Sequence, residues 1–428
     1  MSNGRSLCLH VGHAKTGSSF LQSAFAHSID NLAAAGVHYP LDWKLRRSAK
    51  GGISSGNAGP LIRALDGARG TDAAFPSAPD SMGSLLVSGE TVFPRLEKAG
   101  FVKRLVAEAK AVGLDRVRIL LFIRNPISHC ASNYQQSIKR GGNTGTIDDS
   151  TERFNFPIKV AAAIEACDAE PDVELTIRNY EVARRTLLQE TAAWLGIPDT
   201  ALLRPAMDVV NRSLTRGELE FQRALNQVLG ESGEVLSDVL CELLPAVAAE
   251  HILPSTAAQV RLWDRLAPVM ARINERVGEE HGYRRDVVPT ETEEATSFTF
   301  SAEQIGVIAR ALGAEIARAR FSANGDMALL DRILEAQGDM PANRRLLFER
   351  AKLHADAGED DKAEALLRRL IAVAPDHAVA HNSLARLLAR LGRNADALEL
   401  AERGAELAKD LDGQQRLLAK LKRHLPAA

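Results

Sequence analysis

Residues 7–28, LCLHVGHAKTGSSFLQSAFAHS, constrain the fold of this 428-residue chain more than any other segment. An apolar run of strand length at 7–11 leads into a turn that holds Gly12 and Gly17, and apolar residues then recur at helical spacing. Glycine lets successive backbone N–H groups approach an anion at the positive end of a helix. The segment therefore predicts a strand, a phosphate-binding loop and a helix.

The lysine of this loop is not where a nucleoside triphosphatase places it. Gly12 and Gly17 have the G-x4-G spacing of a phosphate loop, but the Walker pattern puts Lys and then Ser or Thr after the second glycine. Here Ser18 and Ser19 follow Gly17, and the lysine is Lys15, inside the loop. We expect a loop that binds an anionic group with a lysine in its interior.

Strand-like and helix-like segments alternate over the first two thirds of the chain. After the first helix, the strand-like segments are 36–40, 85–88, 117–124 and 173–181. Such alternation predicts an α/β fold of phosphate-loop type, with a mainly parallel β-sheet, helices on both faces, and ligands beyond the carboxyl ends of the strands. Lys15, Glu90 and Arg124 all fall at such ends.

The last part of the chain repeats itself. Ala351, Leu353, Gly358 and Ala363 recur 34 residues later as alanine, leucine, glycine and alanine. A 34-residue period is typical of tetratricopeptide repeats (TPRs), which are helix–turn–helix units. Extending the register backwards predicts a degenerate first repeat from about Arg310, and the basic amphipathic segment at 414–425 predicts a capping helix.

These patterns predict three parts of the chain. Residues 1–284 form the α/β domain, residues 285–301 form a polar linker, and residues 302–428 form an all-α helical-repeat domain with its C-terminal capping helix. A net charge of -2 gives no global electrostatic reason to expect nucleic acid or an anionic membrane as a partner.

The sequence also predicts the location and the redox state of the protein. No secretory signal and no run of 18 apolar residues is present, so we expect a cytoplasmic protein without a membrane span. The four cysteines stand far apart without a CxxC pair, which argues against a zinc site and against a disulfide framework. We expect no metal site.

Four segments together resemble the sulfotransferases that use 3′-phosphoadenosine 5′-phosphosulfate (PAPS), in particular the bacterial members of that family. The segments are HVGHAKTGSSFLQ, LLFIRNPISHCASNYQQ, LTIRNYE and NRSLTRGELEF, and the resemblance spans roughly residues 6–283. The most specific parts are the KTGSS loop and the spacing between Arg124 and Ser132. Residues 1–284 are therefore expected to be a sulfotransferase-like domain.

The resemblance implies a role for each matching residue. The first family motif holds the 5′-phosphosulfate and matches the loop residues Gly12, Lys15, Thr16, Gly17, Ser18 and Ser19. The second motif binds the 3′-phosphate and matches Arg124 and Ser132, where a guanidinium group offers a fork of donors and a serine adds a hydroxyl. A lysine inside the loop can stabilise the charge on the leaving oxygen, which makes Lys15 the first catalytic candidate.

An acceptor hydroxyl also needs a general base within reach. Glu90 is the first candidate, because it follows a strand and its context SGETVF is similar to the glutamate segment that supplies the base in carbohydrate sulfotransferases. His13 is the second, because an imidazole inside the loop can accept a proton at neutral pH. A third residue, not identified from the sequence, also stays open.

The expected activity is transfer of a sulfuryl group from PAPS to a hydroxyl acceptor. A carbohydrate or glycolipid is the expected acceptor, since the Glu90 context favours it and an aromatic content of 5% offers little for a phenol or steroid pocket. One alternative is a non-catalytic nucleotide-binding scaffold whose repeats bind a protein or peptide partner. Another is a kinase-like protein that needs ATP and Mg²⁺.

Overall fold

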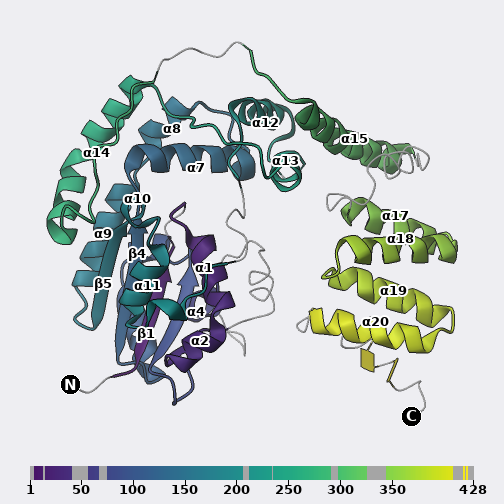
Figure 1. Ribbon diagram of the computed structural model, residues 1–428, viewed down its shortest axis with the longest axis horizontal. Coiled ribbons are helices and arrows are strands. Elements are labelled where there is room, and N and C mark those ends of the chain that lie inside the picture. The colour runs from purple at the N-terminus through teal and green to yellow at the C-terminus, as the bar shows by residue number, and fades with distance from the viewer. Residues whose placement is uncertain are drawn as a thin grey trace. The chain divides into compact units, whose positions relative to one another are not determined.

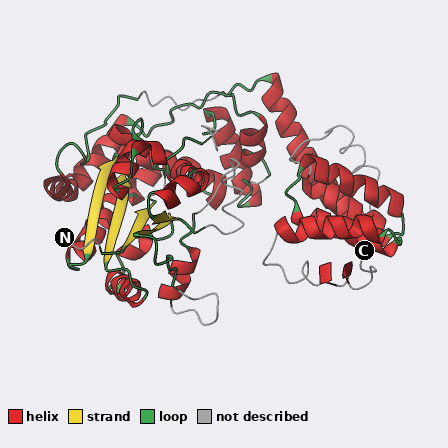
Figure 2. Ribbon diagram, turned by 60° about the horizontal axis from the view of Figure 1, so that its bottom comes forward, coloured by secondary structure: helices red, strands yellow, loops and turns green. Residues whose placement is uncertain are grey.

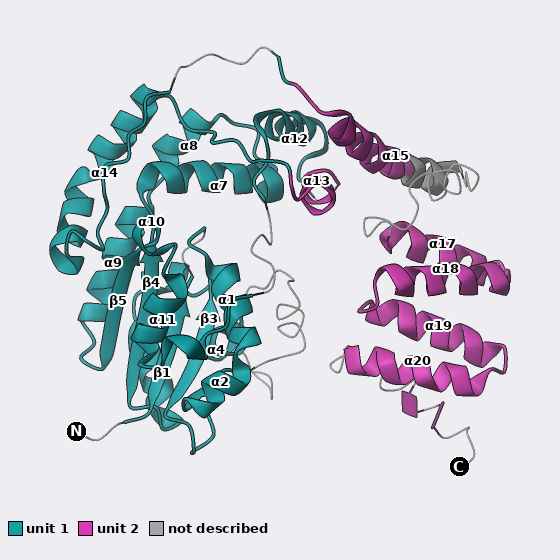
Figure 3. Ribbon diagram, viewed as in Figure 1, with its two compact units in different colours: residues 1–231, 247–298 teal, residues 232–246, 299–428 magenta. Residues whose placement is uncertain are grey.

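The computed structural model describes most of the chain (Figure 1). The described residues are 4–12, 15–40, 56–66, 75–205, 212–233, 235–290, 297–324, 344–407, 418–419 and 421–422. The chain divides into two compact units (Figure 3). Unit 1 comprises Met1–Glu231 and Val247–Phe298, and unit 2 comprises Ser232–Ala246 and Thr299–Ala428.

Unit 1 contains a five-stranded sheet in the order β2-β3-β1-β4-β5, with every neighbouring pair parallel. Figure 2 shows strands of this sheet in yellow, with helices around them. The strands are β1 (Ser6–Val11), β2 (Val37–His38), β3 (Ser84–Gly89), β4 (Arg116–Ile123) and β5 (Val173–Asn179). All six residues of β1 are buried, as expected for a central parallel strand covered on both faces. The predicted α/β class with a mainly parallel sheet is confirmed.

Helices cover both faces of this sheet because successive residues of each strand point to opposite sides. Leu7 and Leu9 pack in a core with α4, α5, α6, α7, α9 and α14, whereas Cys8 packs in a second core with α1, α2 and α11. The helices of unit 1 are α1 (Ser18–His27), α2 (Ile29–Ala34), α4 (Gly59–Leu65), α5 (Phe93–Leu96), α6 (Phe101–Ala111), α7 (Pro126–Gly141), α8 (Ile147–Arg153), α9 (Phe156–Asp168), α10 (Tyr180–Ala183), α11 (Leu187–Leu195), α12 (Arg216–Leu229) and α14 (Thr256–Val277), with a 3-10 helix at Asp199–Ala201.

The described part of unit 2 consists of helices. They are α13 (Ser237–Leu243), α15 (Ala302–Asn324), α17 (Arg344–Asp356), α18 (Asp360–Val373), α19 (Ala378–Arg390) and α20 (Asn394–Leu407). Both α17 and α19, and both α18 and α20, begin 34 residues apart. The equivalent residues Ala351 and Ala385 are both fully buried. Arg393 joins the two helical pairs through an ion pair with Glu364 at 2.9 Å.

Two predicted segments of unit 2 fall largely outside the described residues. The degenerate repeat from Arg310 is described only as far as the end of α15, and the predicted capping helix only at 418–419 and 421–422. Leu421 is buried in the same core as Ala351 and Ala385. The structure therefore describes two helical pairs with the predicted period, and the assignment of three TPRs with a cap stays a prediction.

The two units divide the chain differently from the predicted domain boundaries at two places. Residues 232–246, which the sequence places in the α/β domain, group with unit 2. Residues 285–290, which the sequence places in the linker, pack against unit 1, where the Val288 N–H donates to Gln259 Oε1 at 2.8 Å. Both differences arise because these segments contact residues that are distant in the sequence.

The helices show no segment suited to a lipid bilayer within the described ranges. A membrane span needs about 20 consecutive apolar residues. The two longest described helices, α14 and α15, exceed 20 residues, but charged side chains recur along both. No described helix combines the length and the apolar character needed to cross a membrane.

Phe122 tests the packing of unit 1, because it is fully buried on β4. We expect Phe122→Ala to lower the free energy of unfolding by about 3–5 kcal/mol through lost burial and a cavity. Val228→Ala, at a side chain that is 80% exposed, should change it by less than about 0.5 kcal/mol. Urea unfolding followed by tryptophan fluorescence measures this, since the described tryptophans, Trp194 and Trp263, lie in unit 1. Equal midpoints for the two variants would contradict the described packing.

Candidate anion-binding site at the carboxyl edge of the sheet

Three neighbouring strands bring the predicted site residues to one edge. In the parallel register, Val11 of β1 pairs with Gly89 of β3 and with Leu121 of β4. Glu90 therefore follows β3 beside the point where the loop leaves β1, and Arg124 follows β4 at the same edge. The sequence placed these residues at strand ends, and the strand order β3-β1-β4 makes those ends adjacent.

The loop after β1 contains strained backbone. Lys15 has a φ of 68° and is the one non-glycine residue with positive φ in the described ranges, while Gly17, directly before α1, has a φ of 81°. The left-handed region costs a residue with a Cβ roughly 1–2 kcal/mol. The Lys15 carbonyl accepts a hydrogen bond from Arg124 Nη1 at 3.1 Å, which helps to hold this conformation. Strain of this kind clusters at binding sites.

Both loop glycines lie where a side chain would not fit. A Cβ on Gly12 would lie 2.5 Å from Ser18 Oγ and 2.7 Å from Glu90 Cγ. A Cβ on Gly17 would lie 2.9 Å from Leu187 Cδ2. The Glu90 side chain thus lies directly against the start of the loop. At position 17, both the positive φ and the nearby Leu187 side chain favour glycine.

The start of α1 offers donors to an anion. Among the described residues, the first N–H group of α1 with a backbone partner is that of Leu21, which donates to the Gly17 carbonyl. The N–H groups of the first turn of a helix have no partner within the helix and can donate to an anion. Thr16 and Ser18 are buried, and Ser19 is partly exposed. The Ser18 hydroxyl lies beside Glu90 but makes no well-formed hydrogen bond with the described chain.

Lys15 lies in a positively charged, partly buried environment. Its Nζ donates to Gln136 Oε1 of α7 at 2.8 Å. Burial, and next the positive charge of Lys139, lower the pKa of Lys15 to about 8, while the negative charge of Glu90 opposes them. Arg124 also contributes positive charge. A bound anion would stabilise the ammonium form of Lys15, so this gathering of cations favours an anionic ligand.

Glu90 has the electrostatic character of a base. Burial raises the pKa of Glu90, and the neighbouring Lys15 and Ser18 act in the opposite direction. A carboxylate with a raised pKa accepts a proton more readily near neutral pH. The other predicted base, His13, lies outside the described residues, so its position relative to Glu90 is not part of the description.

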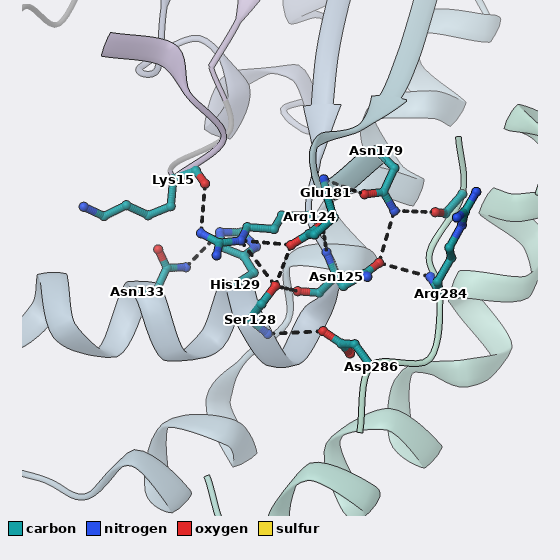
Figure 4. Close-up of polar contacts among 11 residues, drawn as sticks. Lys15, Arg124, Asn125, Ser128, His129, Asn133, Asn179, Glu181, Arg284 and Asp286 are labelled. Carbon is teal, nitrogen blue, oxygen red and sulfur yellow. Dashed lines mark hydrogen bonds and ion pairs between the residues drawn. The ribbon is translucent and has the colours of Figure 1, made fainter. Parts of the chain in front are cut away.

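Arg124 is held by groups on three elements (Figure 4). Its Nε donates to Glu181 Oε1 at 3.1 Å and to Ser128 Oγ at 3.2 Å, and its Nη1 donates to the Lys15 carbonyl at 3.1 Å. The Tyr180 ring centre lies 5.8 Å from the guanidinium carbon. Nη2 makes no hydrogen bond with the described part of the chain. Part of the guanidinium fork therefore remains for a ligand.

Glu181 connects Arg124 to the first turn of α7. Its carboxylate accepts the Ser128 hydroxyl at 2.6 Å and the Asn125 backbone N–H at 3.1 Å. Asn179 Oδ1 in turn accepts the Glu181 N–H at 2.9 Å. The sequence reasoning missed Glu181, although the residue lies in the motif segment LTIRNYE. The signal that could have found it is a second carboxylate directly after a strand.

Ser132 lies on α7 one turn after Ser128 and one turn before Gln136. Ser128 contacts Arg124 and Gln136 contacts Lys15, so this stripe of α7 faces the loop and the end of β4. The partly exposed Ser132 hydroxyl makes no side-chain hydrogen bond with described residues. The structure thus places both predicted 3′-phosphate residues around one stretch of α7.

Asp286 is a further carboxylate at the start of α7 that the sequence reasoning assigned to the linker. Its Oδ2 accepts the Ser128 N–H at 3.4 Å, and its buried Oδ1 has no hydrogen-bond partner among the described residues. Burial raises the pKa of Asp286 to about 6, the hydrogen bond from Ser128 opposes this, and the negative charge of Glu181 adds to it. The α7 N-terminus therefore has two carboxylates close together.

His10, on β1, is a core residue rather than part of this site. Its Nδ1 lies 2.8 Å from Ser88 Oγ, its ring contacts Phe25 and Phe122 edge-on, and burial lowers its pKa to about 4. The imidazole is therefore neutral near pH 7. Within the described ranges, no three His, Cys, Asp or Glu side chains gather in a way that could hold a metal ion.

Comparison with known proteins adds no family assignment. No model of a known protein family matches the chain, and no curated protein matches it either. The resemblance to PAPS-dependent sulfotransferases therefore depends on the four motif segments and on whether the geometry around Lys15 and Arg124 suits such a donor.

Asp286 gives a pH-dependent prediction. A carboxyl pKa raised in the folded state stabilises the fold fully below the unfolded pKa, and this contribution is lost as the pH rises through about 6. Asp286→Asn removes the ionisation, so we expect its thermal midpoint to exceed that of the wild type by an amount that grows between about pH 4 and pH 6 and is constant at higher pH. Thermal unfolding followed by tryptophan fluorescence measures this. A difference that stays constant from about pH 4 to pH 6 would contradict it.

Proposed function

We propose that unit 1 is a PAPS-dependent sulfotransferase that moves a sulfuryl group to a hydroxyl acceptor. The observation that carries this proposal is the meeting of the Lys15 loop and Arg124 at one edge of the sheet, joined by the hydrogen bond from Arg124 to the Lys15 carbonyl. A donor with a 5′-phosphosulfate and a separate 3′-phosphate needs two neighbouring anion-binding places, and this edge offers two.

The loop suits the 5′-phosphosulfate. In this proposal the N–H groups at the start of α1 and the Ser18 hydroxyl donate to the oxygens of the group, and Thr16 and Ser19 flank it. Gly12 and Gly17 keep the backbone close to the ligand. During transfer the bond between sulfur and the bridging oxygen breaks, and the electron pair stays on that oxygen. The Lys15 ammonium group stabilises the charge where it develops.

Arg124 and Ser132 suit the 3′-phosphate. Arg124 Nη2 and the Ser132 hydroxyl are donors without partners in the described chain, and both belong to the segment that runs from the end of β4 into α7. The charge of Lys139 adds positive potential near Lys15. An arginine fork and a hydroxyl are groups that recognise phosphate with defined geometry.

Glu90 is the proposed general base. It takes the proton of the acceptor hydroxyl as the acceptor oxygen forms its bond to sulfur, and its raised pKa suits that step. His13 stays the second candidate. A carbohydrate or glycolipid remains the proposed acceptor, on the basis of the SGETVF context, and a cytoplasmic location remains part of the proposal.

A second proposal concerns unit 2. The 34-residue offset between α17 and α19, repeated between α18 and α20, supports TPRs that bind a protein or peptide partner. If unit 1 only binds nucleotide, this surface would be the functional part of a scaffold. Release of 3′-phosphoadenosine 5′-phosphate (PAP) from PAPS, when a hydroxyl acceptor is present, distinguishes the enzyme from the scaffold.

Lys15 tests the transfer step. We expect Lys15→Ala to lower the rate of radiolabelled sulfate transfer from PAPS to sugar acceptors by about 10²–10³-fold, as when a preorganised donor to a developing negative charge is removed. Lys103→Ala, at an exposed lysine of α6, should keep the wild-type rate. Equal turnover by wild type and Lys15→Ala would overturn the role of the loop.

Arg124 tests donor recognition. Calorimetry with PAP and with adenosine 5′-phosphate separates the contribution of the 3′-phosphate. We expect Arg124→Ala to weaken PAP binding by about 10–100-fold, the value of a hydrogen bond to a charged group, with a smaller loss for adenosine 5′-phosphate. A kinase-like protein would instead bind ATP with Mg²⁺ and tolerate this substitution. If the wild type binds PAP no more tightly than adenosine 5′-phosphate, the proposed function is wrong.

A further inference from the structure

We infer that Glu181 is a positioning residue that sets the nucleotide selectivity of the site, by holding Arg124 and the first turn of α7 in the geometry that receives a 3′-phosphate. This inference rests on the proposed function. Glu181 follows β5, the strand next to β4, and its carboxylate faces the end of β4 across the sheet edge.

Three donors from the segment after β4 converge on the Glu181 carboxylate. Arg124 Nε and Ser128 Oγ both donate to Oε1, at 3.1 Å and 2.6 Å, and the Asn125 N–H donates to Oε2 at 3.1 Å. One carboxylate therefore holds the Arg124 side chain, the Ser128 hydroxyl and the Asn125 backbone at the start of α7. Figure 4 shows these contacts around Arg124.

Several N–H donors of Arg124 have no partner among the described residues. A guanidinium group has five N–H donors. Glu181 and Ser128 share the single Nε donor, and the Lys15 carbonyl takes one Nη1 donor. The second Nη1 donor and both Nη2 donors have no partner in the described chain. Glu181 thus binds Arg124 at the Nε donor and leaves the remaining donors of the terminal nitrogens for a phosphate.

Glu181 is itself held in place. The fully buried Asn179 accepts the Glu181 N–H at 2.9 Å, and its Nδ2 donates to Asn125 Oδ1 at 3.1 Å and to the Gly282 carbonyl at 2.6 Å. The Asn179 side chain at the end of β5 and the Asn125 side chain before α7 therefore link these two elements. A carboxylate anchored in this way can define the position of Arg124, which in turn contacts the strained Lys15.

The Arg124–Glu181 pair is better suited to orientation than to stability. Its side chains are 23% and 31% exposed, and ion pairs accessible to water contribute little to the stability of the fold. An arginine fixed in its binding rotamer, however, loses less conformational entropy when a phosphate arrives. The alternative is that Glu181 occupies the place of the phosphate. In that case removal of the Glu181 carboxylate would tighten nucleotide binding, whereas removal of a positioning residue weakens it.

Calorimetry on the full-length chain with PAP and adenosine 5′-phosphate tests the inference. We expect Glu181→Gln to weaken PAP binding about tenfold, because misplaced binding groups lose affinity for the 3′-phosphate, while adenosine 5′-phosphate changes less than about twofold. The matched control is Glu190→Gln. Glu190 accepts Arg178 Nε at the same 3.1 Å, with side chains 30% and 33% exposed, at a site away from α7. This control should keep the wild-type preference for PAP.

A second variant tests the same positioning role with a smaller change. Ser128→Ala removes one hydrogen bond to Glu181 and should also lower the preference for PAP, by a smaller factor than Glu181→Gln. Circular dichroism checks that each variant is folded. An unchanged PAP preference in folded Glu181→Gln, or tighter PAP binding, overturns the inference and leaves the proposed function standing. A wild type without PAP preference overturns the proposed function, and this inference with it.

Discussion

The parallel pairing of β1 with β3 and β4 is the constraint on which the candidate site depends. Parallel strands end at a common edge, so Glu90, the loop before α1 and Arg124 meet although they lie far apart in sequence. The two faces of the sheet are covered by separate helical cores, which leaves the strand ends as the place where polar side chains can gather.

Charge is the second organising feature of that edge. Lys15 is partly buried near Lys139 and Arg124, which lowers its pKa, whereas the partial burial of the Glu90 carboxyl group raises its pKa. Each group is in an environment that disfavours its charged form, which is common where residues are placed for ligands rather than for stability. Glu181 balances part of the positive charge and fixes the direction of Arg124.

The fold was largely predictable because its signals are local. The apolar runs predicted the strands, and the glycine spacing predicted the loop after β1. The 34-residue period predicted the offset between α17 and α19. The boundaries were less predictable. Residues 232–246 group with unit 2, and residues 285–290 pack on α14, because the partner of a short amphipathic or polar segment is not encoded within that segment.

The sequence alone determined which residues stand at strand ends, and so identified Lys15, Glu90 and Arg124 as candidates. Only the tertiary structure decided what these residues contact. Arg124 meets Glu181 across 57 positions, Lys15 meets Gln136 across 121, and Ser128 meets Asp286 across 158. Such pairs depend on how far each helix is rotated and where each strand pairs in the sheet. Those quantities are set by packing over the whole unit, so no local pattern in the chain records them.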